Sequence, residues 1–378
     1  MGYVKYGVCG CGTVFDTFHS LGAVGQTKYK FTAFYDLNEK KAHRLARRYK
    51  GEHFADLDSM LNSDIDAVLI NVPHHLHRDK VIQAAEAGVH VLCEKPMAPT
   101  LEECDEMIAA TKKADVKFMI AENHRFLPAH KYIADTVHKG LIGNVFLIRA
   151  YEGVNEIPGL TSPGWKGDIK LRNMGALLDM GVHRIATTNW ILNDEIEMAN
   201  CWVTKQCTSL DTKAEDSALV MYRYISGTIM QCTVSFTVIS PPSNELQIYG
   251  TKGTIIENHA LEYPLQIFSD HPDMGANRNR WHIPTDIEHG PFPQYYKISM
   301  GAEDLHFAEC ILNDTEPEFT PQQAKKTIEA VLMAYESANR NKPVTIDKLL
   351  KLIKEKGSEN ILKRLKRHIQ KNYHCIDN

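Results

Sequence analysis

A glycine turn near the N-terminus constrains the fold of this chain more than any other feature. The apolar run 4–9 leads directly into Gly10-Cys11-Gly12, and a second apolar run, 31–35, is followed by Asp36. A strand, a glycine turn, a helix and a second strand that ends in an acidic residue build one half of a dinucleotide-binding fold. The sequence therefore predicts a doubly wound parallel sheet at the N-terminus and a nicotinamide cofactor bound to it.

Each residue of this turn has a physical task. Gly10 permits the sharp exit from the strand, and Gly12 lets the backbone approach a pyrophosphate, toward which the next helix points its free N–H groups. Phe15 stands where a third glycine would pack helix against strand, so phosphate contact does not depend on it. Asp36 would bind the ribose hydroxyls and repel a 2′-phosphate, so NAD is expected rather than NADP. A glycine turn in another class of α/β protein is the alternative.

Length and charge exclude several classes of protein. A chain of 378 residues with a formal net charge of -4 is expected to form two domains and to have no electrostatic attraction to nucleic acid or an anionic membrane. No apolar run reaches the roughly 20 residues that span a bilayer, and the first strand begins too early for a signal peptide. The sequence therefore predicts a cytoplasmic protein.

The cysteines and histidines do not form a metal motif. The nine cysteines are scattered, and Cys9, Cys93 and Cys232 lie in strand-like apolar runs, so buried thiols are expected rather than disulfides. Cys9 and Cys11 are one residue too close for a Cys-x-x-Cys motif. The run His74-His75-Leu76-His77 has no Cys or carboxylate spaced to complete a ligand set. No metal is therefore expected.

The pattern of apolar runs divides the chain. The first third alternates strand-like and helical patterns, which predicts a parallel sheet with helices on both faces. After about residue 145, strand-like runs follow one another, which predicts an α+β domain with an open, mostly antiparallel sheet. We predict an α/β protein with a dinucleotide-binding domain at 1–123, a substrate-binding and oligomerisation domain at 124–345, and a basic helical extension at 346–378. The later helices are expected at 175–192, 302–312 and 321–339, and a long loop at 271–293.

Two short motifs carry side chains suited to acid–base chemistry. Glu94-Lys95-Pro96 follows a buried apolar run, where a parallel sheet meets its ligand, and a lysine there can lower the pKa of a bound hydroxyl. Pro96 would fix the turn and is a candidate for a cis peptide bond. Asp179 and His183 share one face of a predicted helix, where the carboxylate would fix the imidazole tautomer. The alternatives are an exposed loop lysine and a histidine satisfied by its helical neighbour.

These motifs together resemble the Gfo/Idh/MocA family of NAD(P)-dependent oxidoreductases. The resemblance rests on the glycine turn, Glu94-Lys95-Pro96, the Gly-x-x-x-Asp-x-Gly-x-His run from Gly175, and Pro73 followed by His77. It implies an N-terminal Rossmann domain and a C-terminal domain whose open sheet often forms the oligomer interface. It also implies hydride transfer at a hydroxyl of a sugar, inositol or related polyol.

The resemblance implies roles for individual residues. Lys95 is similar to the family's catalytic lysine, His183 to the residue that takes the hydroxyl proton, and Asp179 to the carboxylate that orients the site. The expected substrate contacts are Arg125, Trp165, Lys166, Asp179 and His183. The expected cofactor contacts are Gly10, Gly12, Thr13, Val14, Asp36, Asn71, Pro73, His77, Glu94, Lys95 and Asn123.

The chain departs from the family pattern in three places. Family members often have an acidic residue shortly after the histidine, whereas 184–188 has none, and Asn173-Met174-Gly175-Ala176 replaces a more common double glycine. Residues 348–371 extend past the family's usual end and are rich in Lys and Arg, with apolar residues at near-helical spacing. We expect an amphipathic helix packed on the body or on a neighbouring subunit, the alternative being a tail that binds RNA or a membrane.

The motifs favour an NAD-dependent sugar or polyol dehydrogenase with Lys95 and His183 as its acid–base pair. It is expected to form a homo-oligomer, a dimer or tetramer, through the open sheet. One alternative is an NAD-dependent glycosidase or eliminase, which oxidises a ring hydroxyl transiently and returns the hydride. Another is a regulator that binds NAD(H) as a signal, although a regulator has no need of Lys95, Asp179 and His183.

Overall fold

The computed structural model describes residues 2–156, 175–206, 214–239, 242–258, 261–290 and 293–373. These residues form two units, each with its own sheet. Unit 1 comprises residues 1–126 and 293–325, and unit 2 comprises 127–292 and 326–378. Among the described helices, none is both long enough and apolar enough to cross a bilayer.

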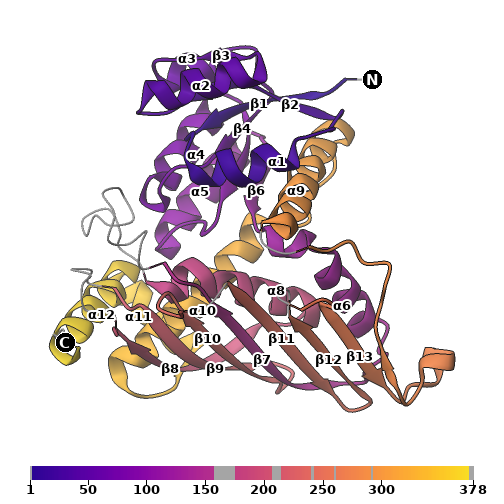
Figure 1. Cartoon of the computed structure of the whole chain (residues 1–378). Coiled ribbons are helices and arrows are strands. Elements are labelled where there is room, and N and C mark those ends of the chain that lie inside the picture. Colours follow the sequence, from indigo (N-terminus) through magenta and orange to yellow (C-terminus); the bar gives the residue numbers. More distant parts are fainter. Residues whose placement is uncertain are drawn as a thin grey trace. The chain divides into compact units, whose positions relative to one another are not determined.

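Unit 1 contains the predicted doubly wound sheet. Its six strands pair in parallel in the order β3-β2-β1-β4-β5-β6 (Figure 1). The strands are β1 (Val4–Cys9), β2 (Tyr29–Tyr35), β3 (Glu52–His53), β4 (Ala67–Ile70), β5 (His90–Glu94) and β6 (Phe118–Ala121). The helices are η1 (Phe15–His19), α1 (Ser20–Gly22), α2 (Glu39–Tyr49), α3 (Leu57–Leu61), η2 (His74–Leu76), α4 (His77–Glu86), α5 (Leu101–Lys113), η3 (Asn123–Phe126) and α9 (Gln294–Asn313).

The central strands of unit 1 are apolar because helices exclude water from both faces. All four residues of β4 are buried, and so are all four of β6. Gly88, just after the end of α4, has a φ of +74°, a conformation that favours glycine and ends the helix. Thr100 caps the N-terminus of α5, because its hydroxyl accepts a hydrogen bond from the Glu103 amide at 3.3 Å. Because β1, β4 and β5 are neighbouring parallel strands, their carboxyl ends lie at one edge of the sheet.

Helix α9 belongs to unit 1, although the sequence placed residues 302–312 in the second domain. The hydroxyl of Tyr6 in β1 donates to the Asp304 carbonyl at 3.0 Å, and Phe307 lies in the same apolar core as Tyr6. Helices α1 and α9 also cross at two glycines, because a Cβ added to Gly22 would lie 2.5 Å from the Gly301 nitrogen. The chain thus returns to complete the first core after building the second sheet.

Unit 2 contains the predicted open sheet. Its order is β14-β13-β12-β11-β7-β10-β9-β8-β15, and only the β10–β7 pair among these is parallel. The strands are β7 (Val145–Gly153), β8 (Ile196–Thr204), β9 (Ser217–Tyr224), β10 (Ile229–Ser235), β11 (Ser243–Gly250), β12 (Gly253–Asn258), β13 (Leu265–Ser269), β14 (Trp281–His282) and β15 (Val344–Thr345). The helices are α6 (Pro128–His138), η4 (Leu177–Gly181), α8 (Val182–Leu192), α10 (Pro321–Arg340), α11 (Ile346–Lys356) and α12 (Ser358–Asn372), with a short η5 (Pro272–Asn277).

One face of the unit 2 sheet carries helices and the other exposes apolar side chains. Helices α6, α8 and α10 lie along the same face (Figure 1). Burial alternates along β9, and Trp202 of β8 is 50% exposed opposite the exposed Leu219 of β9. Phe146 and Ile229 are also exposed. An uncovered apolar face of this kind is typical of an interface, and homo-oligomerisation through it stays a prediction.

The C-terminal extension forms two helices, so the prediction of one continuous helix was wrong. Gly357 separates α11 from α12 with a φ of +75°, a conformation that ends the first helix. Of the two placements that were expected, on the body or on a neighbouring subunit, the structure shows packing on the body. The Asn339 side chain of α10 donates to the Ile361 carbonyl at 3.1 Å, and Arg364 pairs with Glu336. The apolar residues Leu349, Leu352, Ile361, Leu362, Leu365 and Ile369 are buried.

Two other local expectations were refined. Residues 271–290 contain η5 and β14 rather than loop alone, and β14 pairs with β13. The thiols of Cys9, Cys93 and Cys232 are free and buried, as expected from their apolar runs. Burial raises the pKa of the Cys9 thiol to about 12, which keeps this thiol protonated and unreactive.

The crossing of α1 and α9 should tolerate no added atom. Gly22→Ala is expected to destabilise the protein by about 1–3 kcal/mol, because the new methyl group meets α9 backbone rather than a movable side chain. Thermal unfolding measures the effect. Gly2→Ala, whose Cβ meets no atom within 4 Å, is the control. An unchanged Gly22→Ala melting temperature would contradict the tight crossing.

Candidate cofactor and active site

The glycine turn is held by a close backbone contact between β1 and β4. Gly10 has a φ of +102°, and a Cβ at this position would lie 2.3 Å from the Asn71 carbonyl oxygen. The Gly10 amide donates to the Tyr35 carbonyl at 2.8 Å, which ties the turn to β2 as well. Only glycine fits both the conformation and the space.

Gly12 and Thr13 leave the N-terminus of the following helix accessible to solvent. A Cβ on Gly12 would meet no atom within 4 Å. Thr13 is exposed, and the first helical hydrogen bond runs from the Asp16 amide to the Gly12 carbonyl at 3.0 Å. The amides of Thr13 and Val14 precede this bond, so they face outward as donors for an anion.

Asp36 is fixed beside the turn at the end of β2. One carboxylate oxygen accepts from the Cys11 amide at 2.7 Å, and the other accepts from the Asn38 amide at 2.7 Å. The carboxylate is therefore oriented by backbone donors and stands next to the open helix end. This placement is the one that recognition of a ribose diol requires.

Phe15 stands at the position of the third glycine of the fingerprint, and its side chain is well packed. Its ring is buried and packs edge-on against Phe31 at 4.9 Å and Phe34 at 6.0 Å between centroids. The backbone over 15–19 is a π-helix, whose wider turn accommodates the large side chain at a helix start. The departure from the fingerprint is thus absorbed by an aromatic cluster.

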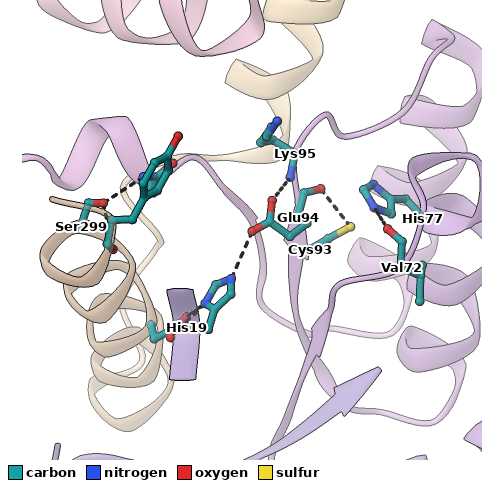
Figure 2. Close-up of polar contacts among 10 residues, drawn as sticks. His19, Val72, His77, Cys93, Glu94, Lys95 and Ser299 are labelled. Carbon is teal, nitrogen blue, oxygen red and sulfur yellow. Dashed lines mark hydrogen bonds and ion pairs between the residues drawn. The ribbon is translucent and has the colours of Figure 1, made fainter. Parts of the chain in front are cut away.

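The Glu94-Lys95-Pro96 turn lies at the end of β5, and its Lys95–Pro96 peptide is cis, as the sequence suggested. Glu94 is buried, and its Oε2 accepts from the Lys95 amide at 3.1 Å. The His77 ring lies between two carbonyls, 2.9 Å from that of Pro96 and 3.0 Å from that of Val72, the second of which is drawn in Figure 2. His77 therefore holds the turns after β4 and β5 together.

The other Glu94 oxygen contacts His19, which belongs to a buried cluster of ionisable side chains that the sequence analysis did not predict. Oε1 of Glu94 lies 3.1 Å from Nε2 of His19, whose Nδ1 lies 3.0 Å from an Asp304 carboxylate oxygen (Figure 2). His19 and Asp304 are both completely buried. The available signal was the pair Glu303-Asp304 within a mostly apolar stretch of helix, since charged residues buried together require partners.

Two predicted contacts after β6 are engaged within unit 1. The Asn123 side chain donates to the Ser299 hydroxyl of α9 at 2.9 Å. The Arg125 guanidinium donates to the Glu318 carbonyl at 2.6 Å and lies 4.8 Å from the Phe319 ring centroid. Burial lowers the pKa of Arg125 to about 10. These partners hold the Asn123 and Arg125 side chains in place. The contact of Asn123 with the cofactor and that of Arg125 with the substrate stay predictions.

Asp179 and His183 lie on one helical run in unit 2, made of the π-helical η4 and α8. His183 is 4% exposed, and Asp179 is partly buried. Arg184, where the family often has an acidic residue nearby, forms a buried ion pair with Glu152 at 3.0 Å. The predicted substrate contacts Trp165 and Lys166 lie outside the described residues.

Glu215 anchors the start of this helical run and was also missed by sequence reasoning. Its Oε1 accepts from the Leu177 amide at 3.1 Å and from the Tyr335 hydroxyl at 2.8 Å. A Cβ on Gly175 would lie 2.0 Å from the Glu215 carboxyl carbon, which explains the glycine at the start of the motif. Burial raises the pKa of Glu215 to about 7.

One buried group has the composition of a metal site. His19, Glu303 and Asp304 each offer a ligand atom, and these atoms lie within 4.8 Å of one another. Both nitrogens of His19 face carboxylates, however, which is the arrangement of a doubly donating ring. His77, from the histidine-rich run, faces two carbonyls that would compete with a metal for its ring.

The residues of unit 1 fit a dinucleotide. The space beside Gly12, the outward amides of Thr13 and Val14, and the fixed carboxylate of Asp36 match the demands of pyrophosphate and ribose. Asn71 adds a buried amide nitrogen that has no hydrogen-bond partner among the described residues. These groups gather at the carboxyl edge of the sheet, where such ligands bind.

Comparison with known proteins agrees with this assignment. Residues 4–122 match the family model "Oxidoreductase family, NAD-binding Rossmann fold", and residues 130–256 match "GFO/IDH/MocA C-terminal domain". A trans-1,2-dihydrobenzene-1,2-diol dehydrogenase from Xenopus tropicalis is 27% identical over 315 residues, 82% of this chain and 89% of that protein. A 1,5-anhydro-D-fructose reductase from Ensifer adhaerens is 32% identical over 200 residues, 52% of this chain and 58% of that protein.

A solved structure shares the fold over nearly the whole chain. Levoglucosan dehydrogenase in complex with NADH superposes with a TM-score of 0.82 at 23% identity, covering 91% of this chain and 99% of that chain. The predicted combination of a Rossmann-like parallel sheet and a mostly antiparallel second sheet is confirmed.

Substitutions at the two glycines should separate folding from binding. Gly12→Ala is expected to leave the melting temperature unchanged but to weaken NADH binding at least about tenfold, because its methyl group occupies the space for the pyrophosphate. Gly10→Ala is expected to destabilise the protein itself, because it collides with Asn71. Fluorescence titration with NADH and thermal unfolding check both. Equal NADH affinity in Gly12→Ala would refute this placement of the cofactor.

Glu215 should make stability depend on pH. Its folded pKa lies above the ordinary value of 4.5, so its stabilising effect is present below pH 4.5 and is lost as pH rises toward about 7. Glu215→Gln stays neutral, so its stability relative to the wild type is expected to rise across this range by about 3 kcal/mol. Chemical denaturation at pH 5 and pH 8 measures the difference. Glu86→Gln, at an exposed position of α4, is the control. A stability difference between Glu215→Gln and the wild type that is independent of pH would contradict the assignment.

Proposed function

Because the chain belongs to the Gfo/Idh/MocA family of oxidoreductases, we propose that it is an NAD-dependent dehydrogenase of a sugar, inositol or related polyol. The observation that carries the proposal is the shared edge of the unit 1 sheet. The glycine turn follows β1, and Lys95 follows β5, with β4 between these two strands. The residues that fit the cofactor and the candidate catalytic lysine therefore lie on one rigid support.

In the proposed reaction the cofactor, when bound, supplies the hydride acceptor. Lys95 donates a hydrogen bond to the substrate hydroxyl and lowers its pKa. His183 accepts the hydroxyl proton, and Asp179 orients its ring. In the reverse direction the same groups return the proton to a ketone. Asp36 selects NAD, because a 2′-phosphate would meet a fixed carboxylate.

The relatives support a small hydroxylated substrate. Their names describe enzymes of a cyclic diol and an anhydro sugar, and the structural neighbour acts on levoglucosan. We therefore place the substrate among cyclic polyols and pyranosides. Open-chain alcohols that lack neighbouring hydroxyl groups are expected to be poor substrates.

The experiment tests a panel of cyclic polyols, pyranosides and anhydro sugars as substrates, with NAD or NADP as oxidant. Turnover is measured by the absorbance of the reduced cofactor. One substrate class is expected to give NADH, with NAD preferred. Lys95→Ala is expected to lower kcat by about 10²–10⁴-fold, because it removes an acid–base group while leaving the glycine turn and Asp36 in place. Lys40→Ala, an exposed change on α2, is the control.

Three results would contradict the proposal in whole or in part. Glycoside cleavage without accumulation of NADH would instead identify an enzyme that recycles its hydride. Tight NADH binding with no turnover of any compound in either direction would favour a regulator. Retention of full activity by Lys95→Ala would remove Lys95 from the reaction.

A further inference from the structure

The buried group around His19 is not used by the reaction as proposed. His19 belongs to η1, Glu94 ends β5, and Glu303 and Asp304 belong to α9, so three separate elements of unit 1 meet at this point. All four residues are at most 6% exposed. Burying four ionisable groups together is costly unless they satisfy one another, so their arrangement requires an explanation.

The His19 ring is the centre of the group. Its Nδ1 lies 3.0 and 3.1 Å from the two oxygens of Asp304, and its Nε2 lies 3.1 Å from Oε1 of Glu94. Carboxylates only accept hydrogen bonds, so satisfying both requires a proton on each ring nitrogen. Burial alone lowers the pKa of His19, but the carboxylates of Asp304 and Glu94 outweigh burial and raise it well above its ordinary value.

The surrounding charges agree with a cationic ring. Burial, followed by the Glu94 carboxylate, raises the pKa of Glu303 well above its ordinary value, which leaves that side chain neutral. Other titratable groups lie near these side chains, among them Tyr6, Tyr29, Tyr49 and Glu122, and burial raises the pKa of the three tyrosines. One cation thus stands between the carboxylates of Asp304 and Glu94, beside a neutral Glu303.

Glu94 connects the His19 ring to the turn that contains Lys95. Its two oxygens are divided between partners, Oε1 to the His19 ring and Oε2 to the Lys95 amide at 3.1 Å (Figure 2). His19 in turn lies on the helical run whose N-terminal amides, those of Thr13 and Val14, are the expected pyrophosphate contacts. A single side chain therefore connects the phosphate-binding helix to the backbone of Lys95.

We propose that His19 is a positioning residue for Lys95, which it fixes relative to the cofactor-binding helix by holding Glu94 against the Lys95 amide. This inference rests on the proposed function. It predicts that His19 affects turnover through Glu94 rather than through cofactor affinity. Asp304 holds the other side of the ring and keeps it directed at Glu94.

The test is a double-mutant cycle of His19→Gln, Glu94→Gln and the double variant in the full chain. His19→Gln is expected to lower kcat about 10–100-fold while the Kd for NADH changes less than about threefold. The double variant is expected to be no slower than Glu94→Gln alone, because both changes break the same link. His306→Gln, a histidine of α9 whose ring accepts from the Glu318 amide, is the matched control.

Several outcomes would overturn the inference. These are an unchanged kcat in His19→Gln, a parallel loss of NADH affinity, or multiplicative losses in the double variant. Stoichiometric metal in the purified wild type would also overturn it, since the ring would then be a ligand. If the wild type binds NADH but has no dehydrogenase activity, the proposed function fails instead.

A measurement on the wild type keeps the test independent of the variants' folding. With ¹⁵N-labelled histidine, NMR is expected to detect one ring that remains doubly protonated at pH 8.5, because two buried carboxylates hold its protons. This readout does not depend on activity. Its absence would show that the ring lacks the two donated hydrogen bonds, and the inference would fail.

Discussion

The approach of Gly10 to the Asn71 carbonyl sets the geometry on which the rest of unit 1 depends. A side chain at this point would push β1 from β4, and the turn between β1 and its helix would lose its shape. Because the contact exists, the helix end, Asp36 and the turn after β5 all lie at one edge of the sheet. The chemistry proposed for the protein follows from this backbone contact more than from any single side chain.

The sequence predicted those parts of the site that depend on local backbone demands. Gly10, Asp36 and the Lys95–Pro96 turn were each recognisable because a few consecutive residues determine their conformation. The sequence did not predict the partners of His19, because Asp304 lies 285 residues away along the chain. It missed Glu215 for the same reason, since Leu177 and Tyr335 reach it from distant helices. The return of α9 to unit 1 likewise required knowledge of which core Phe307 completes.

Two departures from the expected motifs, at Phe15 and at Arg184, have local structural accounts. Phe15 occupies an aromatic cluster with Phe31 and Phe34, so its size is used in packing and is not a defect in the turn. Arg184 is balanced by Glu152 inside unit 2. A missing motif residue therefore does not by itself indicate a lost activity, because a neighbouring element can supply the packing or charge that the motif residue supplies elsewhere.

The π-helical segment η1 has a consequence for the spacing of the chain. Successive residues of an α-helix are rotated by about 100° around its axis, and a π-turn holds one residue more per turn than an α-turn holds. Removal of one residue from 15–19 would restore an α-helix and rotate the phosphate-facing amides away from their direction relative to His19. The number of residues between the glycine turn and His19 is thus itself a structural parameter, and a relative with a different count needs a different helical winding to keep both ends in place.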